Sequence, residues 1–185
     1  MRIISGKFRG KKIFFTNSET TRPLRDFVKE NIFNVLLHWR NDKIKFSDLN
    51  ILDLYSGVGS FGIECISRDA KKVVFIEKDK TAFSILKKNI NFLNITKKAQ
   101  LLNIDINYFI EKKYDNKFDI VFFDPPFKDD SFLKVIELLR KGKFLNDPHI
   151  IIIHREKKSE DELNKNLKIH STKYYGRSKV IFCSF

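Results

Sequence analysis

The sequence lacks the features of secreted, membrane-spanning and metal-binding proteins. It has two cysteines, Cys65 and Cys183, and their spacing fits neither a disulfide framework nor a metal site. No stretch reaches the roughly 20 apolar residues that a membrane-spanning helix needs, and the N-terminus has no apolar core for a signal peptide. We therefore expect a soluble cytoplasmic protein that uses no membrane and no metal.

Acidic residues are also in short supply relative to basic ones. The 185 residues include 36 Lys and Arg against 23 Asp and Glu, which gives a formal net charge of +13. This charge favours a polyanionic partner, most simply a nucleic acid, although a compositional bias toward Lys, Asn, Ile and Phe is another explanation. Length and a hydrophobic fraction of 42% indicate one main domain, expected over 41–185, with an N-terminal extension over 1–40.

Apolar runs alternate with amphipathic segments from residue 49 onward. This alternation predicts βαβ units and an α/β, Rossmann-like fold, with a mostly parallel sheet covered on both faces. Strands are expected at 51–55, 72–77, 99–103, 118–124, 150–154, 167–175 and 179–185, and helices near 60–68, 80–93, 105–113 and 129–141. Earlier in the chain, Gly6 and Gly10 predict a short hairpin within residues 1–15, and helical spacing predicts a helix over 26–39.

The most informative segment is the apolar run 118–123, which is followed by Asp124, Pro125, Pro126 and Phe127. Prolines cannot continue a strand, so the chain breaks at Asp124, at the sheet edge where ligands of open α/β folds bind. A carboxylate, backbone carbonyls and a flat ring at this edge suit a planar base with an exocyclic amine. The alternative is a turn that only ends the strand.

A glycine-rich loop follows the first strand of the alternating region. Gly57, Gly59 and Gly62 have the spacing of a dinucleotide-binding loop, in which glycines let the backbone approach a ligand. The triplet alone also fits a nicotinamide- or flavin-dependent oxidoreductase. Asp53 argues against that reading, because its carboxylate would face a negative pyrophosphate. A carboxylate there suits a cationic amine, such as that of S-adenosylmethionine.

Two more carboxylates are expected at the same edge of the sheet. Glu77 ends the second strand, 20 residues after Gly57, where it can accept both ribose hydroxyls of the cofactor. Asp105 follows the third strand and can accept from the adenine amine, and capping of the next helix is its alternative role. The residues expected to bind the cofactor are Asp53, Tyr55, Gly57, Gly59, Glu77 and Asp105.

These motifs, in this order, resemble those of amino-methylating S-adenosylmethionine-dependent methyltransferases. Segments 1–12, 21–23, 26–30, 33–34 and 62–64 extend the resemblance to the RsmD-type family over nearly the whole chain. That family methylates the N2 amine of a guanine in 16S ribosomal RNA. Many proteins of the wider group carry Asn at the position of Asp124, and a carboxylate also accepts from an amine.

The resemblance implies a class I methyltransferase fold with a seven-stranded sheet and S-adenosylmethionine as the cofactor. It implies 16S ribosomal RNA as the partner, within the small subunit or an assembly intermediate. It also implies a catalytic turn made of Asp124, Pro125, Pro126 and Phe127. In that turn, Asp124 and the Pro125 carbonyl accept hydrogen bonds from the guanine amine, and Phe127 stacks on the base.

Basic residues near the N-terminus are the expected RNA contacts. They are Arg9, Lys11, Lys12, Arg22 and Arg25, whose charges suit RNA phosphates, and a merely solvated surface is the alternative. His154 ends the expected fifth strand without an evident partner and is interpreted as structural. The residues alone also allow methylation of adenine N6 in DNA or RNA, methylation of a protein amide, or RNA binding without catalysis.

Overall fold

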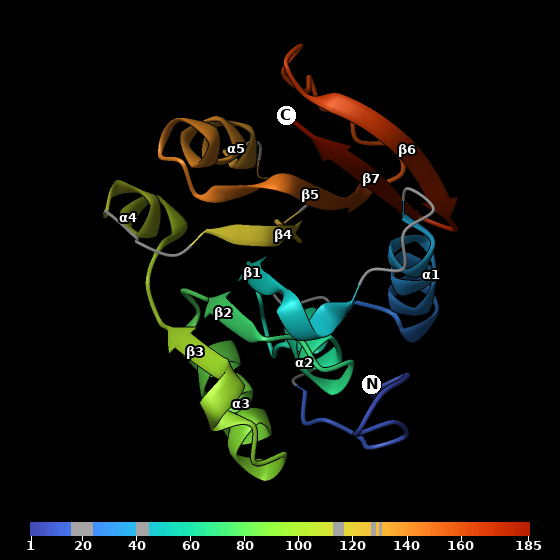
Figure 1. Cartoon of the computed structure of the whole chain (residues 1–185), viewed down its shortest axis with the longest axis vertical. Coiled ribbons are helices and arrows are strands. Elements are labelled where there is room, and N and C mark those ends of the chain that lie inside the picture. The colour runs from blue at the N-terminus through green and yellow to red at the C-terminus, as the bar shows by residue number, and fades with distance from the viewer. Residues whose placement is uncertain (16–23, 40–44, 113–116, 127–128, 130) are drawn as a thin grey trace.

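The computed structural model describes residues 1–15, 24–39, 45–112, 117–126, 129 and 131–185. Its strands are β1 (Asn50–Leu54), β2 (Lys72–Ile76), β3 (Ala99–Leu102), β4 (Phe118–Phe123), β5 (Leu145–Glu156), β6 (Lys168–Tyr175) and β7 (Ser178–Ser184). They form one seven-stranded sheet in the order β3-β2-β1-β4-β5-β7-β6 (Figure 1). The first five strands pair in parallel, and β7 pairs antiparallel with both β5 and β6. The mostly parallel seven-stranded sheet is therefore confirmed.

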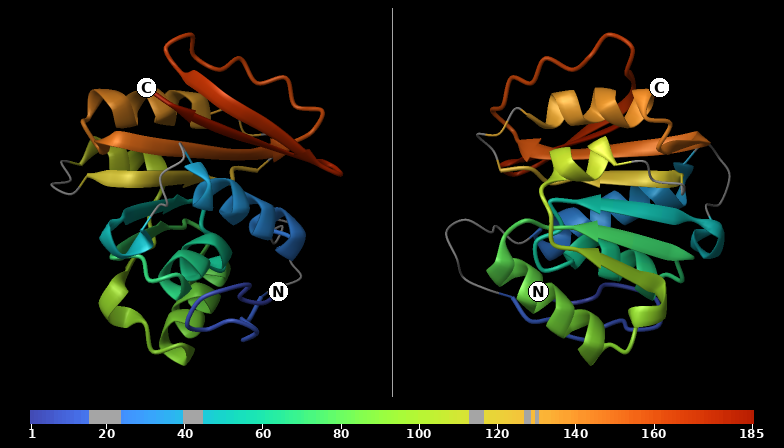
Figure 2. Two further views of the ribbon diagram at one scale, coloured as in Figure 1. Left: turned by 45° about the vertical axis from the view of Figure 1, so that its right-hand side comes forward. Right: turned by 90° about the vertical axis from the view of Figure 1, so that its left-hand side faces the viewer.

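Helices cover both faces of this sheet (Figure 2). One face carries α1 (Asp26–Leu37), α2 (Ser60–Ser67) and α3 (Lys80–Phe92), and the other carries α4 (Ile106–Glu111) and α5 (Phe132–Lys141). Short 3-10 helices, η2 (Phe46–Asp48) and η3 (Thr96–Lys98), precede β1 and β3. Because side chains alternate along a strand, Ile51 packs in the α1–α2 core, whereas Leu52 packs in the α5 core. None of the helices in the described ranges is long and apolar enough to cross a membrane.

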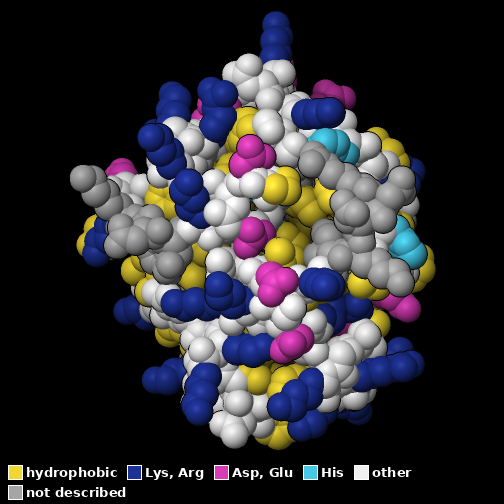
Figure 3. Space-filling view, in the orientation of Figure 1, with side chains coloured by type: hydrophobic (Ala, Val, Ile, Leu, Met, Phe, Trp, Pro, Cys, Tyr) yellow, Lys and Arg dark blue, Asp and Glu magenta, His cyan; other side chains and the backbone are white. Residues whose placement is uncertain are grey.

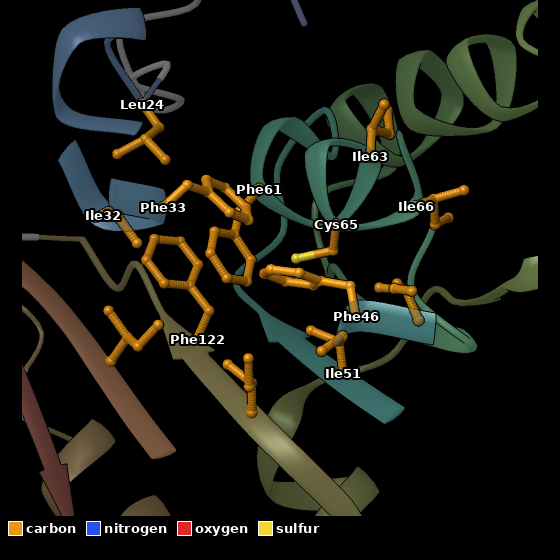
Figure 4. Packing of buried hydrophobic residues seen from close by; sticks show 14 of the residues in the cluster. Leu24, Ile32, Phe33, Phe46, Ile51, Phe61, Ile63, Cys65, Ile66 and Phe122 are labelled. Atoms are coloured by element: carbon orange, nitrogen blue, oxygen red, sulfur yellow. The ribbon is translucent and has the colours of Figure 1, made fainter. Parts of the chain in front are cut away.

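Three phenylalanine rings join the N-terminal helix to the strand that leads to the Asp-Pro-Pro turn (Figure 4). Phe61 of α2 stacks on Phe122 of β4 with 4.1 Å between ring centroids, and Phe33 of α1 lies 5.3 Å from Phe61 on the other side. All three rings are buried. Helix α1 therefore shares one core with the sheet, and the predicted domain boundary near residue 40 falls in 40–44, outside the described residues.

The N-terminal segment forms the predicted hairpin without two regular strands. One antiparallel bridge between Arg2 and Lys12 joins its arms, and the N–H groups of Ile3 and Gly10 donate across it to the carbonyls of Lys11 and Ile3 at 2.9 and 2.8 Å. Other backbone donors of the segment bind α2. Two of its N–H groups donate to the carboxylate of Glu64 at 2.7 and 2.9 Å, and a third donates to the carbonyl of Ser67 at 2.7 Å.

Candidate functional site

The register of the sheet brings the ends of β1, β2 and β4 to one level with Ile153 of β5. Leu54 of β1 pairs with β2 on one side and with Phe123 of β4 on the other, and Phe123 pairs in turn with β5. The residues that follow these pairs along their strands are Tyr55, Glu77, Asp124 and His154. Parallel strands therefore deliver these four side chains to one edge of the sheet, as expected for the binding edge of an open α/β fold.

The glycine loop has the geometry that its spacing predicts. Gly57 and Gly59 have φ values of 54° and 90°, in the left-handed region that favours glycine. A Cβ on Gly62 would lie 2.3 Å from the Phe75 ring, so this glycine lets α2 pack closely on β2. The Gly57 N–H donates to a carboxylate oxygen of Glu77 at 2.7 Å, which ties the loop to the end of β2.

Asp53 is a buried carboxylate, with 1% of its surface exposed. The N–H of Gly62 donates to its Oδ2 at 2.9 Å. Burial raises the pKa of Asp53 well above its usual range, although this hydrogen bond acts to lower it. The charges of Asp124 and Glu77 raise the pKa further. Within the described ranges no Lys or Arg forms an ion pair with Asp53. This part of the site therefore fits a cationic ligand group.

Glu77 combines a structural contact with capacity for a ligand. Its two oxygens accept from the N–H groups of Gly57 and Asp79 at 2.7 and 2.8 Å. Burial raises the pKa of Glu77 despite these two hydrogen bonds. Each carboxylate oxygen has a further lone pair, so the predicted acceptance of ribose hydroxyls is compatible with the existing contacts.

Tyr55 follows β1, and Asp105 lies between β3 and α4. Tyr55 is half-buried, and burial raises the pKa of its hydroxyl to about 12. Asp105 caps α4 by accepting from the N–H of Asn107 at 2.9 Å, and this bond contributes most to lowering its pKa. The capping role of Asp105 is therefore observed, and its contact with adenine stays a prediction.

Asp124 has a partner that the sequence reasoning missed. Its side chain is 21% exposed, and its Oδ1 lies 2.8 Å from Nδ1 of His154. The other ring nitrogen of His154 lies 2.9 Å from Oγ of Ser178. The interpretation of His154 as a histidine without a partner at the site is therefore wrong. The only signal in the sequence was that 150–154 was expected to be a parallel strand that ends at this edge.

Arg155 fixes the other end of the turn and was also missed. Its guanidinium donates to the carbonyl of Pro126 at 3.0 Å and to Asp161 at 2.8 Å, and Lys179 lies 3.2 Å from the same carboxylate. Burial opposes ionisation of Asp161, but a hydrogen bond from Ser159 and the charges of Arg155 and Lys179 lower its pKa overall. This buried cluster anchors the backbone of the turn at the Pro126 carbonyl.

The expected RNA contacts lie on the surface where the structure describes them. Arg9, Lys11, Lys12 and Arg25 are exposed, and the Lys11 ammonium lies 5.4 Å from the centre of the Phe8 ring. Figure 3 shows acidic side chains along the middle of one face with Lys and Arg side chains around them. Two expected site residues, Arg22 and Phe127, lie outside the described residues.

Comparison with known proteins places this arrangement in a family. A family model described as conserved hypothetical protein 95 matches residues 1–184. The chain belongs to this family. The proteins named ribosomal RNA small subunit methyltransferase D from Haemophilus influenzae and from Buchnera aphidicola of Acyrthosiphon pisum are 37% and 34% identical to it. These matches span 85% and 92% of this chain and 79% and 86% of the two relatives.

Solved structures agree with this family assignment. The structure of yhhF from Escherichia coli, which is described as a methyltransferase, is 29% identical, with a TM-score of 0.84 over 99% of this chain and 96% of its own. The predicted resemblance to the RsmD-type family and the class I methyltransferase fold are thereby confirmed. Membership in this methyltransferase family also argues against the nicotinamide-dependent alternative.

Proposed function

We propose that this protein transfers a methyl group from S-adenosylmethionine to the exocyclic N2 amine of a guanine in 16S ribosomal RNA. The relatives named ribosomal RNA small subunit methyltransferase D support RNA as the substrate class, and the net charge of +13 suits a polyanion. The observation that carries the proposal is the partly exposed Asp124 carboxylate, held at the sheet edge beside Asp53.

The residues at the edge fit this cofactor. S-adenosylmethionine supplies a methyl group on a positively charged sulfur and has a cationic amine. The carboxylate of Asp53 accepts that amine, which provides the positive charge that the cluster of Asp53, Glu77 and Asp124 lacks. Glu77 accepts the ribose hydroxyls, and the left-handed glycines of the loop let its backbone approach the ligand closely.

The Asp-Pro-Pro turn orients the amine for attack. The amine of guanine is a weak nucleophile, because its lone pair is delocalised into the ring. Hydrogen bonds to Asp124 and to the Pro125 carbonyl localise that lone pair, and they strengthen as positive charge develops on nitrogen. The Pro126 carbonyl already accepts from Arg155, whereas no donor within the described part of the chain contacts the Pro125 carbonyl.

The geometry also sets a condition on the RNA. A guanine within a helix cannot reach a pocket at a sheet edge, so the target is a looped or flipped base, and Phe127 stacks on it. We infer that the folded small subunit or an assembly intermediate presents this base.

The direct test is Asp124→Ala, with the exposed Glu111→Ala as the matched control. We expect Asp124→Ala to keep its affinity for S-adenosylmethionine, measured by calorimetry, while methyl transfer to the RNA falls roughly 100- to 1000-fold. Glu111→Ala should keep both properties. Retained activity in Asp124→Ala would remove the proposed role of the turn.

The position of the new methyl group is tested separately. Nucleoside analysis of ribosomal RNA from a strain that lacks the gene, with and without the restored gene, should show N2-methylguanosine returning with the gene. A methyl group on adenine N6 would instead select the adenine alternative. Assays on naked 16S RNA and on small subunits show which form of the RNA is the substrate.

A further inference from the structure

Asp124 is part of a chain of three polar side chains. The His154 ring lies between its two partners, with Nδ1 2.8 Å from Oδ1 of Asp124 and Nε2 2.9 Å from Oγ of Ser178. His154 and Ser178 are 6% and 7% exposed, so water competes little for these contacts. The chain runs from the end of β4 through β5 to the start of β7, three strands that are neighbours in the sheet.

The chemistry of the two partners determines where the hydrogens lie. An ionised carboxylate only accepts hydrogen bonds, so Nδ1 of His154 carries the hydrogen of its contact with Asp124. In the neutral ring, Nε2 then accepts from the Ser178 hydroxyl. Oδ1 of Asp124 thereby accepts one hydrogen bond that fixes its position, and no donor among the described residues contacts Oδ2.

We propose that His154 is a positioning residue for methyl transfer, with Ser178 holding its ring. This inference rests on the proposed function. The Nδ1–H group prevents the carboxylate of Asp124 from turning and directs Oδ2 toward the substrate amine. An error of about 1 Å in such an arrangement can lower a rate by two orders of magnitude, so orientation of this oxygen matters for the reaction.

The proton balance leaves His154 unchanged. The lone pair of the amine forms the new N–CH3 bond while the electron pair of the S–CH3 bond stays on sulfur. The methylated nitrogen then releases its extra proton to Oδ2 of Asp124. His154 keeps its hydrogen on Nδ1 throughout and continues to donate to Oδ1.

The same arrangement limits which groups can react. An Asn side chain presents both a donor and an acceptor, and its orientation decides which of them faces the substrate. Asp124 with one oxygen held by His154 presents an acceptor only. The pair therefore favours a reacting nitrogen that carries a hydrogen, as the exocyclic amine of guanine does.

Two substitutions of His154 separate positioning from packing. Asn places its amide nitrogen near the position of Nδ1 and can still donate to Asp124. Gln places its amide near the position of Nε2, so it can reach Ser178 but not Asp124. We expect His154→Gln to lower the single-turnover rate of methyl transfer roughly 10- to 100-fold, and His154→Asn to restore most of it. Both should bind S-adenosylmethionine with unchanged affinity.

Equal losses in the two variants, or full activity in His154→Gln, would overturn the proposal. Two further measurements do not depend on how well these variants fold. Ser178→Ala removes the support of the ring and should lower the same rate, and an unchanged rate counts against the proposal. The ¹⁵N chemical shifts of His154 in the wild-type protein should show hydrogen on Nδ1, and hydrogen on Nε2 alone would refute the assignment. Absence of methyl transfer by the wild type would refute the proposed function instead.

Discussion

At the scale of single residues, we expect the Asp53 carboxylate to strengthen ligand binding and to lower the stability of the ligand-free protein. Its carboxylate is buried, and burial raises its pKa, to which the charges of Asp124 and Glu77 add. We expect Asp53→Asn to stabilise the ligand-free protein, because the amide oxygen still accepts the Gly62 N–H while the buried charge is removed. A gain of about 1 kcal/mol would raise the Tm of a protein of this size by roughly 2–4 °C. Affinity for S-adenosylmethionine should fall on the order of tenfold to a hundredfold, through loss of a charged hydrogen bond.

The pH dependence of this effect has a definite sign. Since the folded-state pKa of Asp53 lies above its unfolded value, the native protein keeps a proton that the unfolded chain has lost. The protonated Asp53 side chain contributes its full share to the free energy of unfolding below the unfolded pKa of about 4. This share is lost as pH rises through the folded-state pKa. The difference in Tm between Asp53→Asn and wild type should therefore grow as pH rises above about 4. A difference that is constant with pH would contradict this account, and the exposed Asp48→Asn serves as the control.

The meeting of the acidic residues could be predicted from the sequence, and the contact of His154 could not. Asp53, Glu77 and Asp124 lie at the ends of apolar runs, and parallel strands bring such ends to one edge. The contact of His154 with Asp124 joins residues 30 positions apart, and it depends on β5 lying beside β4. Nothing in the local pattern of a single strand fixes which strand lies beside it.

At the scale of elements, α2 links the N-terminal segment to the cofactor loop. Gly59 of the loop is its N-cap residue, and its last turn binds the backbone of residues 4–8. Glu64, which makes two of these contacts, is fully buried and also pairs with Arg68 at 2.9 Å. The N-terminal segment is therefore attached to the same helix whose first turn follows the glycine loop.

Gly6 and Gly10 offer a matched test of this attachment. Both have positive φ, 81° and 84°, so Ala carries similar backbone strain at either position. A Cβ on Gly6 would lie within 1.9 Å of the Ser67 carbonyl oxygen, whereas a Cβ on Gly10 meets nothing within 4 Å. We expect Gly6→Ala to lower the free energy of unfolding by about 1–3 kcal/mol more than Gly10→Ala. Denaturant unfolding measures the difference, and equal effects would show that the close contact with α2 does not matter.

The predicted strands and helices of the alternating region are all present, because their hydrophobic periodicity is local. Two details differ for reasons that lie elsewhere in the chain. The predicted hairpin has one bridge and a few backbone hydrogen bonds rather than two regular strands, and some of its donors bind Glu64 and Ser67. Strand β5 begins at Leu145 rather than near residue 150. The sequence disfavoured that earlier start, because Pro148 lacks the N–H of a regular strand residue.

At the scale of the whole molecule, the placement of charge should govern RNA binding. The variant to test replaces four expected RNA contacts with Ala: Arg9, Lys11, Lys12 and Arg25. Each phosphate contact contributes about 0.7–0.9 to the slope of log affinity against log salt concentration. If all four residues contact phosphates, the slope should fall by about 3. Affinity measured from 50 to 300 mM salt gives this slope, and affinity for S-adenosylmethionine should not change.

A second variant with the same loss of charge separates position from total charge. It replaces four exposed lysines outside the N-terminal segment with Ala: Lys141, Lys157, Lys158 and Lys165. Both variants carry four fewer positive charges than the wild type, so long-range attraction to RNA falls by a similar amount in each. Only direct contacts release counterions from phosphates, and we therefore expect the second variant to keep most of the salt dependence. If the two variants lose the same slope, the net charge rather than the N-terminal surface determines RNA affinity, and the assignment of these four contacts is wrong.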